Sequence, residues 1–185
     1  MIDNTHFDIL NVIETHGTYQ PEKPAVCCGE ITRLWQDLKQ NINKVANFLK
    51  EIGVGKGDNV ALLIGNRPEI IELIFGIVKT GACVVPLSGL LTKEQVTVLV
   101  NNSNAKLFVV DNEFINLVTT DITQFKNLDK DMLLYLGGEL DCWKKISSQD
   151  NEYGFEYNCS PEDDFNIIYS SGTTGVPKGI VQTHR

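Results

Sequence analysis

The hydrophobic positions of residues 33–52 follow the spacing of a helix. Apolar residues recur every three or four positions, at Leu34, Leu38, Ile42, Val45, Ala46 and Leu49. This spacing places them on one face of a helix. Thr32 is a suitable N-cap, and Gly53 stands where a left-handed residue commonly ends a helix. The pattern predicts an amphipathic helix that buries one face.

The next segment changes to a strand-like pattern. Residues 60–64 form a short, continuous apolar run, which is typical of a strand buried on both faces of a parallel sheet. Pro68 suits the first position of a helix over 68–80 that stops at Gly81. Residues 82–86 form a second apolar strand. The order predicts a βαβ unit with a right-handed crossover.

The same rhythm continues downstream. Thr92 and Gln95 have the spacing of a capping box at the start of another helix. Residues 107–110 form a third apolar strand, which we expect to be parallel to the first two. The repeated order of helix and strand predicts an open α/β sandwich.

The C-terminal third has a weaker pattern. Residues 132–136 are predicted to form a strand that ends at the two glycines after it. The polar stretch 141–163 is predicted to be an exposed connector. Two further strands, 165–169 and 180–183, enclose a polar loop.

Composition and charge narrow the function. The chain has 185 residues, 42% of them hydrophobic, and carries 24 acidic against 16 basic residues, a net charge of -8. Binding to nucleic acid or to an anionic membrane surface requires a field of Lys and Arg. These partners are therefore not expected, and the oligomeric state is left open.

The cysteines and the N-terminus bear on the cellular compartment of the protein. Five cysteines are present, Cys27 and Cys28 are adjacent, and no C-x-x-C pair occurs. We expect neither a disulfide framework nor a metal site, and predict reduced, mostly buried thiols. The N-terminus lacks the features of a signal peptide, and no apolar run could span a bilayer. A cytoplasmic location is predicted.

The polar loop combines groups that suit a polyphosphate. Glycines at 172 and 175 let backbone N–H groups approach a ligand closely. Hydroxyl groups and one ammonium group converge on the same short segment. The candidate phosphate-binding residues are Ser170, Ser171, Gly172, Thr173, Thr174 and Lys178.

Three other interpretations of this loop are weaker. A flexible connector explains the glycines and hydroxyls, but not why Pro177 stiffens the approach to a lysine. A Walker A loop would need Ser or Thr after the lysine and then a helix, whereas Gly179 and a β-branched run follow. A serine amidase would need a Gly-Gly-Ser-Ser-Gly-Gly context and an upstream lysine.

The residues from Ser170 to Gly179 (SSGTTGVPKG) resemble the phosphate-binding signature of the AMP-forming adenylating enzymes. This superfamily contains acyl-CoA synthetases, adenylation domains of non-ribosomal peptide synthetases and luciferases. The pattern is most similar to that of acyl- or aryl-CoA ligases. Further similar segments are Glu22–Ala25, Leu49–Gly53, Gly57–Leu62, Asn66–Glu69, Gly81–Leu87 and Leu91–Glu94.

The resemblance implies a two-step reaction. A carboxylate attacks the α-phosphorus of ATP and releases pyrophosphate, and a thiol, usually that of coenzyme A, then takes the acyl group and releases AMP. The six loop residues would hold the β- and γ-phosphates. ATP, Mg²⁺, coenzyme A and a small carboxylic acid are the implied ligands, and none is expected to be tightly bound here.

The resemblance also implies an incomplete domain. Residues 1–160 would form an α/β subdomain and residues 161–185 a strand, phosphate loop and strand. Family members are much longer, and their catalytic lysine and Mg²⁺-placing acid would lie beyond Arg185. We therefore expect this chain alone to be inactive. A stand-alone nucleotide-binding or scaffold module, or a peptide synthetase domain, are the alternatives, and the reading frame beyond Arg185 discriminates the module from the ligase.

Overall fold

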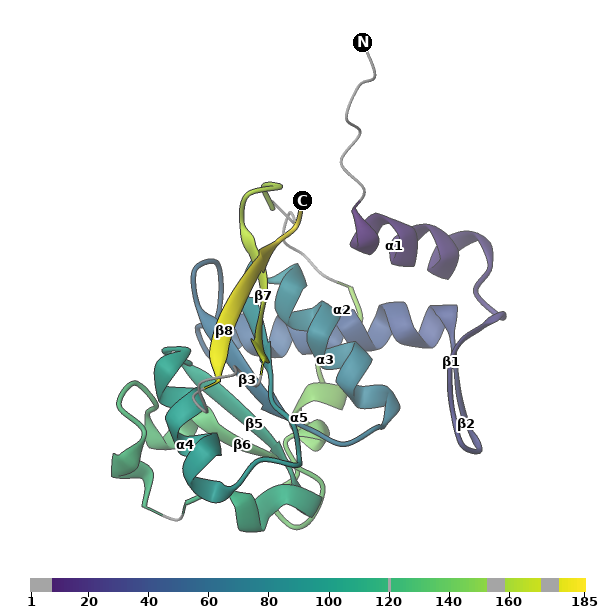
Figure 1. Cartoon of the computed structure of the whole chain (residues 1–185). Coiled ribbons are helices and arrows are strands. Elements are labelled where there is room, and N and C mark those ends of the chain that lie inside the picture. Colours follow the sequence, from purple (N-terminus) through teal and green to yellow (C-terminus); the bar gives the residue numbers. More distant parts are fainter. Residues whose placement is uncertain (1–7, 120, 153–158, 171–176) are drawn as a thin grey trace.

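A computed structural model describes residues 8–119, 121–152, 159–170 and 177–185. These residues form a mixed α/β fold around a six-stranded sheet (Figure 1). The strands are β3 (Asn59–Leu63), β4 (Cys83–Pro86), β5 (Leu107–Asp111), β6 (Leu133–Leu136), β7 (Asp164–Ser170) and β8 (Lys178–Thr183). The helices are α1 (Ile9–Tyr19), α2 (Trp35–Glu51), α3 (Pro68–Lys79), α4 (Lys93–Asn102) and α5 (Trp143–Ser147).

The sheet is parallel except at one edge. Its strand order is β6-β5-β3-β4-β7-β8. Strand β3 pairs in parallel with both β4 and β5, which confirms the predicted arrangement of these three strands. The pairs β5–β6 and β4–β7 are also parallel, and only β8 runs antiparallel to its neighbour β7. The predicted α/β sandwich is therefore confirmed.

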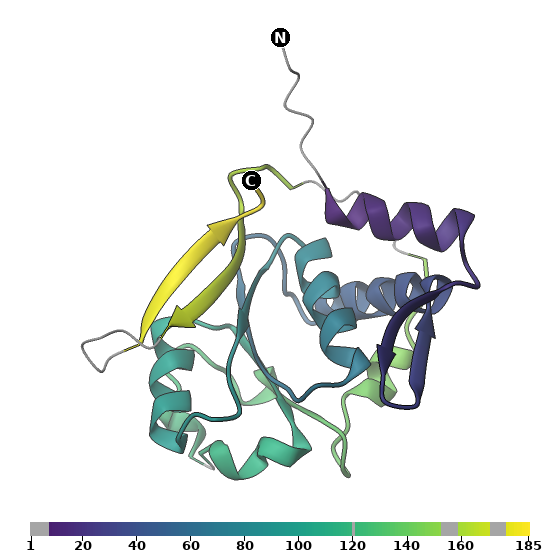
Figure 2. The ribbon, with the colours of Figure 1, turned by 45° about the vertical axis from the view of Figure 1, so that its right-hand side comes forward.

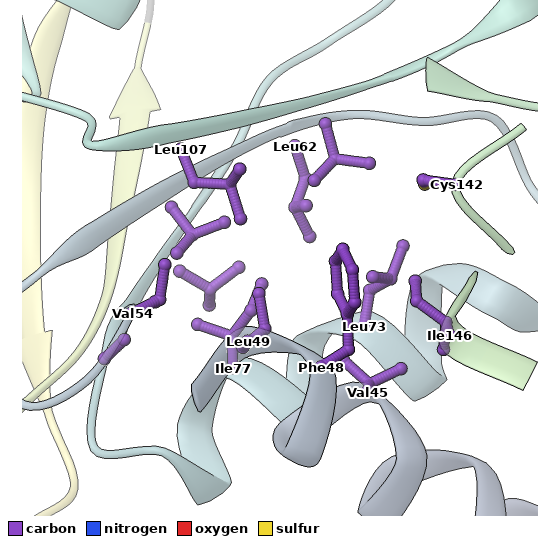
Figure 3. Packing of buried hydrophobic residues seen from close by; sticks show 14 of the residues in the cluster. Val45, Phe48, Leu49, Val54, Leu62, Leu73, Ile77, Leu107, Cys142 and Ile146 are labelled. Atoms are coloured by element: carbon purple, nitrogen blue, oxygen red, sulfur yellow. The ribbon is translucent and has the colours of Figure 1, made fainter. Parts of the chain in front are cut away.

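Alternate residues of the central strands face two different cores. Val60 and Leu62 of β3 pack on α2, α3 and α5, together with Phe48 of α2 (Figure 3). Ala61 and Leu63 point the other way, toward α4 and the short 3₁₀ helices Asn112–Leu117, Ile122–Gln124 and Lys130–Met132. Because both faces are covered, the central strands consist of continuous apolar runs.

Most predicted helix ends are confirmed. Gly53 and Gly81 follow α2 and α3 with φ of 81° each, the left-handed conformation that glycine adopts without steric cost. Pro68 occupies the first turn of α3, and the Thr92–Gln95 capping box is present in both directions. The cap predicted at Thr32 is wrong. Thr32 lies in a strand, and α2 begins at Trp35, where Asp37 accepts a hydrogen bond from the Leu34 N–H.

The sequence predicted that the stretch 141–163 is an exposed connector, and this prediction is wrong in part. It contains α5, whose Ile146 side chain is buried in the core beside α2. Asn47 of α2 also donates hydrogen bonds to the backbone carbonyls of Asp150 and Glu152. A helix of five residues with one buried apolar side chain is too short to show a helical period, so no local pattern predicts it.

The N-terminal elements had no predicted counterpart. Helix α1 is capped by Asp8 and packs on α2. A two-stranded antiparallel sheet, β1 (Pro24–Cys28) and β2 (Ile31–Leu34), stands apart from the main sheet (Figure 2). The cysteines also differ from expectation, because only Cys83 and Cys142 are buried.

The close crossing of α2 and α3 yields a first testable prediction. A Cβ atom added at Gly76 of α3 would lie 2.3 Å from Val45 Cγ1, and Val45 is fully buried. Although alanine favours helices, Gly76→Ala should lower the free energy of unfolding by about 1–3 kcal/mol through overpacking. Urea denaturation measures this. Gly55→Ala is the control, because the nearest atom to a Cβ added there is Lys50 Nζ at 3.8 Å, an ordinary contact. Equal effects of the two substitutions would contradict the prediction.

Candidate functional site

The candidate phosphate loop joins β7 to β8 at the carboxyl edge of the parallel strands. Strand β7 is parallel to β4, so Ser170 at its end lies at the same edge as the loops after β3, β4 and β5. Ligands of open α/β sheets bind at this edge. The antiparallel β7–β8 pair confirms the predicted hairpin.

The structure brings the two ends of the loop together. Ser170 and Lys178 are register partners across the β7–β8 ladder, and both are exposed. Directly paired residues of antiparallel strands share one face. A hydroxyl group and an ammonium group therefore flank the loop on the same side. The other four predicted residues, Ser171, Gly172, Thr173 and Thr174, lie outside the described residues.

Tyr169 anchors the strand that enters the loop. Its hydroxyl group donates to Asn102 Oδ1, at the end of α4, at 2.7 Å. Its ring packs, with Ile167, on the hydrophobic core between the sheet and α4. Burial raises the pKa of Tyr169, so the neutral, donating form persists at neutral pH. A Cβ atom at Gly179 would lie 3.2 Å from the Tyr169 ring, which explains why glycine follows Lys178.

A second polar cluster lies at the carboxyl ends of β3 and β5. Arg67 Nε donates to Glu69 Oε2 at 2.9 Å, and Arg67 Nη1 donates to Asp111 Oδ2 at 3.3 Å. Burial is the largest single influence and would raise the Glu69 pKa, but the hydrogen bond from Arg67, a backbone hydrogen bond and the charges of Arg67 and Arg33 together lower it. These residues line an open pocket of about 520 Å³ with Ile31, Gly65, Asn66 and Glu113.

This cluster was not predicted from the sequence. Its members follow two buried strands directly, Arg67 and Glu69 after β3 and Asp111 at the end of β5. In the sheet, β3 leads to β4 on one side and β5 leads to β6 on the other, so the chain order changes direction between β3 and β5. Such a switch point is where ligands bind in open sheets. Polar residues at the ends of neighbouring apolar strands were the signal that could have identified the cluster.

The described residues contain neither a metal-binding cluster nor a membrane-spanning helix. Within residues 8–119, 121–152, 159–170 and 177–185, no three or more His, Cys, Asp or Glu side chains are grouped so as to hold a metal ion. Over the same ranges, no helix combines the length and apolar character needed to cross a membrane.

The known sequences that this chain resembles include acyl-activating ligases. Residues 13–185 match a family model described as AMP-binding enzyme. A fatty acid–acyl-carrier-protein ligase, ScoC of Streptomyces coeruleorubidus, is 30% identical over 97% of this chain and 34% of its own length. A crotonobetaine/carnitine–CoA ligase of Salmonella arizonae is 32% identical over 91% of this chain and 34% of its own length. The chain thus spans about a third of these relatives.

Solved structures share the fold. The anthranilate CoA ligase AuaEII, in complex with anthranoyl-AMP, matches 97% of this chain and 34% of its own, with a TM-score of 0.87 and 27% identity. A fatty acyl CoA synthetase of Mycobacterium tuberculosis matches 96% of this chain and 34% of its own, with a TM-score of 0.82 and 24% identity. The second likeness is one of fold alone.

Proposed function

Because this chain belongs to the AMP-binding enzyme family, we propose that it supplies the phosphate-binding part of an ATP-dependent acid–thiol ligase. In the complete ligase, a carboxylate oxygen attacks the α-phosphorus of ATP. The bond from that phosphorus to the bridging oxygen breaks, and pyrophosphate leaves with the bond's electrons. A thiolate then attacks the acyl carbon of the adenylate, and AMP leaves.

The observation that carries this proposal is the pairing of Ser170 with Lys178 at the carboxyl edge of the sheet. A fixed ammonium group can neutralise charge that accumulates on the leaving pyrophosphate. The Ser170 hydroxyl group can donate to a phosphate oxygen beside it. We assign the same phosphate-binding role to Ser171, Gly172, Thr173 and Thr174 on the resemblance of the motif.

We further propose how the complete ligase is divided. Residues 1–160 form one subdomain, and residues 161–185 form the strand, phosphate loop and strand. The groups that place Mg²⁺, hold the acid and complete the transfer belong to the two thirds of the relatives that this chain does not span. A cytoplasmic location, predicted from the sequence, stays a prediction.

The identity of the thiol has two candidates. Coenzyme A is favoured by relatives named as CoA ligases, at 32–33% identity. An acyl-carrier protein is the second candidate, because the relative ScoC is named as an acyl-carrier-protein ligase. The first half-reaction is the same with either thiol. Measuring thioester formation by the complete ligase with coenzyme A and with an acyl-carrier protein discriminates the two candidates.

Exchange of labelled pyrophosphate into ATP tests the proposal. A complete ligase that carries this sequence should catalyse exchange that depends on an added carboxylic acid. The 185-residue chain alone should show no exchange above background, because the acid-binding and metal-placing groups are proposed to lie outside it. Acid-independent exchange by the complete protein, or none with a broad panel of acids, would overturn the function. Clear exchange by the 185-residue chain alone would overturn the proposal that the acid-binding and metal-placing groups lie outside it.

A further inference from the structure

The β1–β2 hairpin, residues 24–34, is only partly integrated into the fold. It forms its own two-stranded sheet and stands beside α2 and α3, on the opposite side of the molecule from β8 (Figure 2). Two-stranded hairpins are marginally stable in water unless they pack on something else. Its apolar contacts are made by Ala25 and Val26, which pack on the cluster formed by α1, α2 and α3.

Arg33 of β2 fastens this hairpin to two carboxylates of α3, Glu69 at 3.6 Å and, more closely, Glu72. Arg33 Nε of β2 donates to Glu72 Oε1 at 3.1 Å, and Glu72 is fully buried. Asn41 Nδ2 of α2 donates to the same oxygen at 2.8 Å, while Glu72 Oε2 has no partner among the described residues. If the hairpin moved away, an ionised Glu72 would lose its neutralising cation, so its charge keeps the hairpin in place.

The hairpin also forms one wall of the pocket at the carboxyl ends of β3 and β5. Ile31 of β2 lines that pocket, and its side chain is part of the exposed surface. Cys28 Sγ donates to the backbone carbonyl of Asn66, which follows β3, at 3.2 Å. Cys28 is half-buried at this seam, whereas its neighbour Cys27 is exposed. Movement of the hairpin would therefore open the pocket and uncover Cys28.

We propose that the β1–β2 hairpin is a hinged strap, latched to α3 by the Arg33–Glu72 contact, and that loss of charge on Glu72 releases the strap and opens the pocket. This inference concerns access to a pocket apart from the phosphate loop and does not depend on the proposed ligase reaction. On release Glu69 would lose its weaker contact with Arg33, at 3.6 Å, but Arg67 would still hold Glu69 and Asp111, so the rest of the polar cluster stays in place.

Acid is the expected trigger. The charged and hydrogen-bonding groups that face Glu72 are Arg33 from β2, Asn41 from α2 and Glu69 from α3 itself. Burial outweighs the first two and raises the pKa of Glu72, and the neighbouring Glu69 charge adds to the rise. As the pH falls, Glu72 is therefore neutralised before exposed glutamates are.

Site-resolved thiol labelling tests the latch. The 185-residue chain is treated with N-ethylmaleimide at low conversion, and fragment-ion mass spectrometry assigns the label to Cys28 or Cys27. The ratio of the two labelling rates cancels the common effect of pH on thiolate formation. In the wild-type chain this ratio should rise as the pH is lowered from about 7.5 to a value just above the ordinary glutamate pKa, because burial raises the pKa of Glu72.

Two variants give matched comparisons. Glu72→Gln keeps the side-chain shape and removes the charge, so its ratio at the higher pH should exceed the wild-type ratio about tenfold, as expected for one charge-assisted hydrogen bond. Its ratio should also no longer depend on pH. Lys56→Gln breaks an ion pair with Asp163, distant from the hairpin, and should leave the wild-type behaviour unchanged.

Circular dichroism separates release of the strap from unfolding. A wild-type ratio that stays constant with pH while the fold is intact would overturn the proposal. So would a folded Glu72→Gln chain with the wild-type ratio. If Glu72→Gln failed to fold, the wild-type pH series and the ratio in Arg33→Gln, expected to be high at both pH values, would decide.

Discussion

In a complete ligase that carries this sequence, Lys178→Ala is expected to slow acyl-adenylate formation about 10²–10³-fold, or about 2.7–4 kcal/mol. Negative charge builds on the leaving pyrophosphate as the α-phosphorus is attacked. A fixed ammonium group therefore stabilises the transition state more than bound ATP. Lys178 is exposed at the start of β8, directly across from Ser170, so it can reach a phosphate held by the loop.

The two half-reactions distinguish this role from a structural one. Thioester formation from supplied acyl-adenylate releases no pyrophosphate, so Lys178→Ala should barely affect it. Lys178→Arg retains the charge and should recover part of the adenylation rate. Lys126→Ala, at an exposed lysine elsewhere, should leave both steps unchanged. An equal loss in both half-reactions, or normal adenylation by a folded Lys178→Ala enzyme, would rule out this role.

The second large effect is expected from Arg33→Ala, which should lower the free energy of unfolding by about 3 kcal/mol at neutral pH. The substitution leaves the carboxylate of Glu72 buried without its cation. We expect the lower end of the range for buried ion pairs because a quarter of the Arg33 side chain is exposed and water screens it. Urea denaturation of the 185-residue chain measures the loss.

Glu72→Gln is the matched comparison for this prediction. Replacing both charges of a buried pair costs little, since the penalty of desolvating the carboxylate disappears with it. The double variant Arg33→Ala/Glu72→Gln should therefore be more stable than Arg33→Ala alone. If the two substitutions were additive, Glu72 would not be the reason for the loss.

The pH dependence of stability follows from the raised pKa of Glu72. The native state holds this proton to a higher pH than the unfolded chain does. The Glu72 contribution to the free energy of unfolding is therefore largest below the ordinary glutamate pKa and falls as the pH rises through the raised one. Glu72→Gln should remove this component, and Arg33→Ala should enlarge it. Unfolding curves measured across this pH window check the sign.

The central part of the fold could be predicted from local pattern because each signal there has one physical cause. The run from Val60 to Ile64 is apolar because both faces of β3 are covered. Gly53 and Gly81 stand where the backbone needs a positive φ. Pro68 stands in the first turn of α3, where a backbone N–H has no partner within the helix, so proline loses no hydrogen bond there. Each of these causes acts over a few consecutive residues, so a short stretch of sequence is enough to predict the element.

The N-terminal part could not be predicted because long-range contacts hold it. The β1–β2 hairpin is short and none of its strand residues is buried, so it shows no clear alternation of apolar and polar positions. Its stability comes from packing on α1, α2 and α3 and from the contact of Arg33 with Glu72, 39 positions along the chain. Helix α5 is similar, because one turn that buries Ile146 has no detectable period.

The sequence by itself determined the α/β class, the parallel central strands, the hairpin around the loop and the resemblance to adenylating enzymes. Periodicity, turn residues and a ten-residue motif are all local properties of the chain. Only the tertiary structure decided that Ser170 faces Lys178, that Arg67 joins Glu69 to Asp111, and that Arg33 meets a buried Glu72. Ser170 meets Lys178 through the register of one hairpin, whereas strand order brings Arg67 to Asp111 and the packing of α3 brings Glu72 to Arg33. No local sequence signal encodes the last two contacts, which join residues 44 and 39 positions apart.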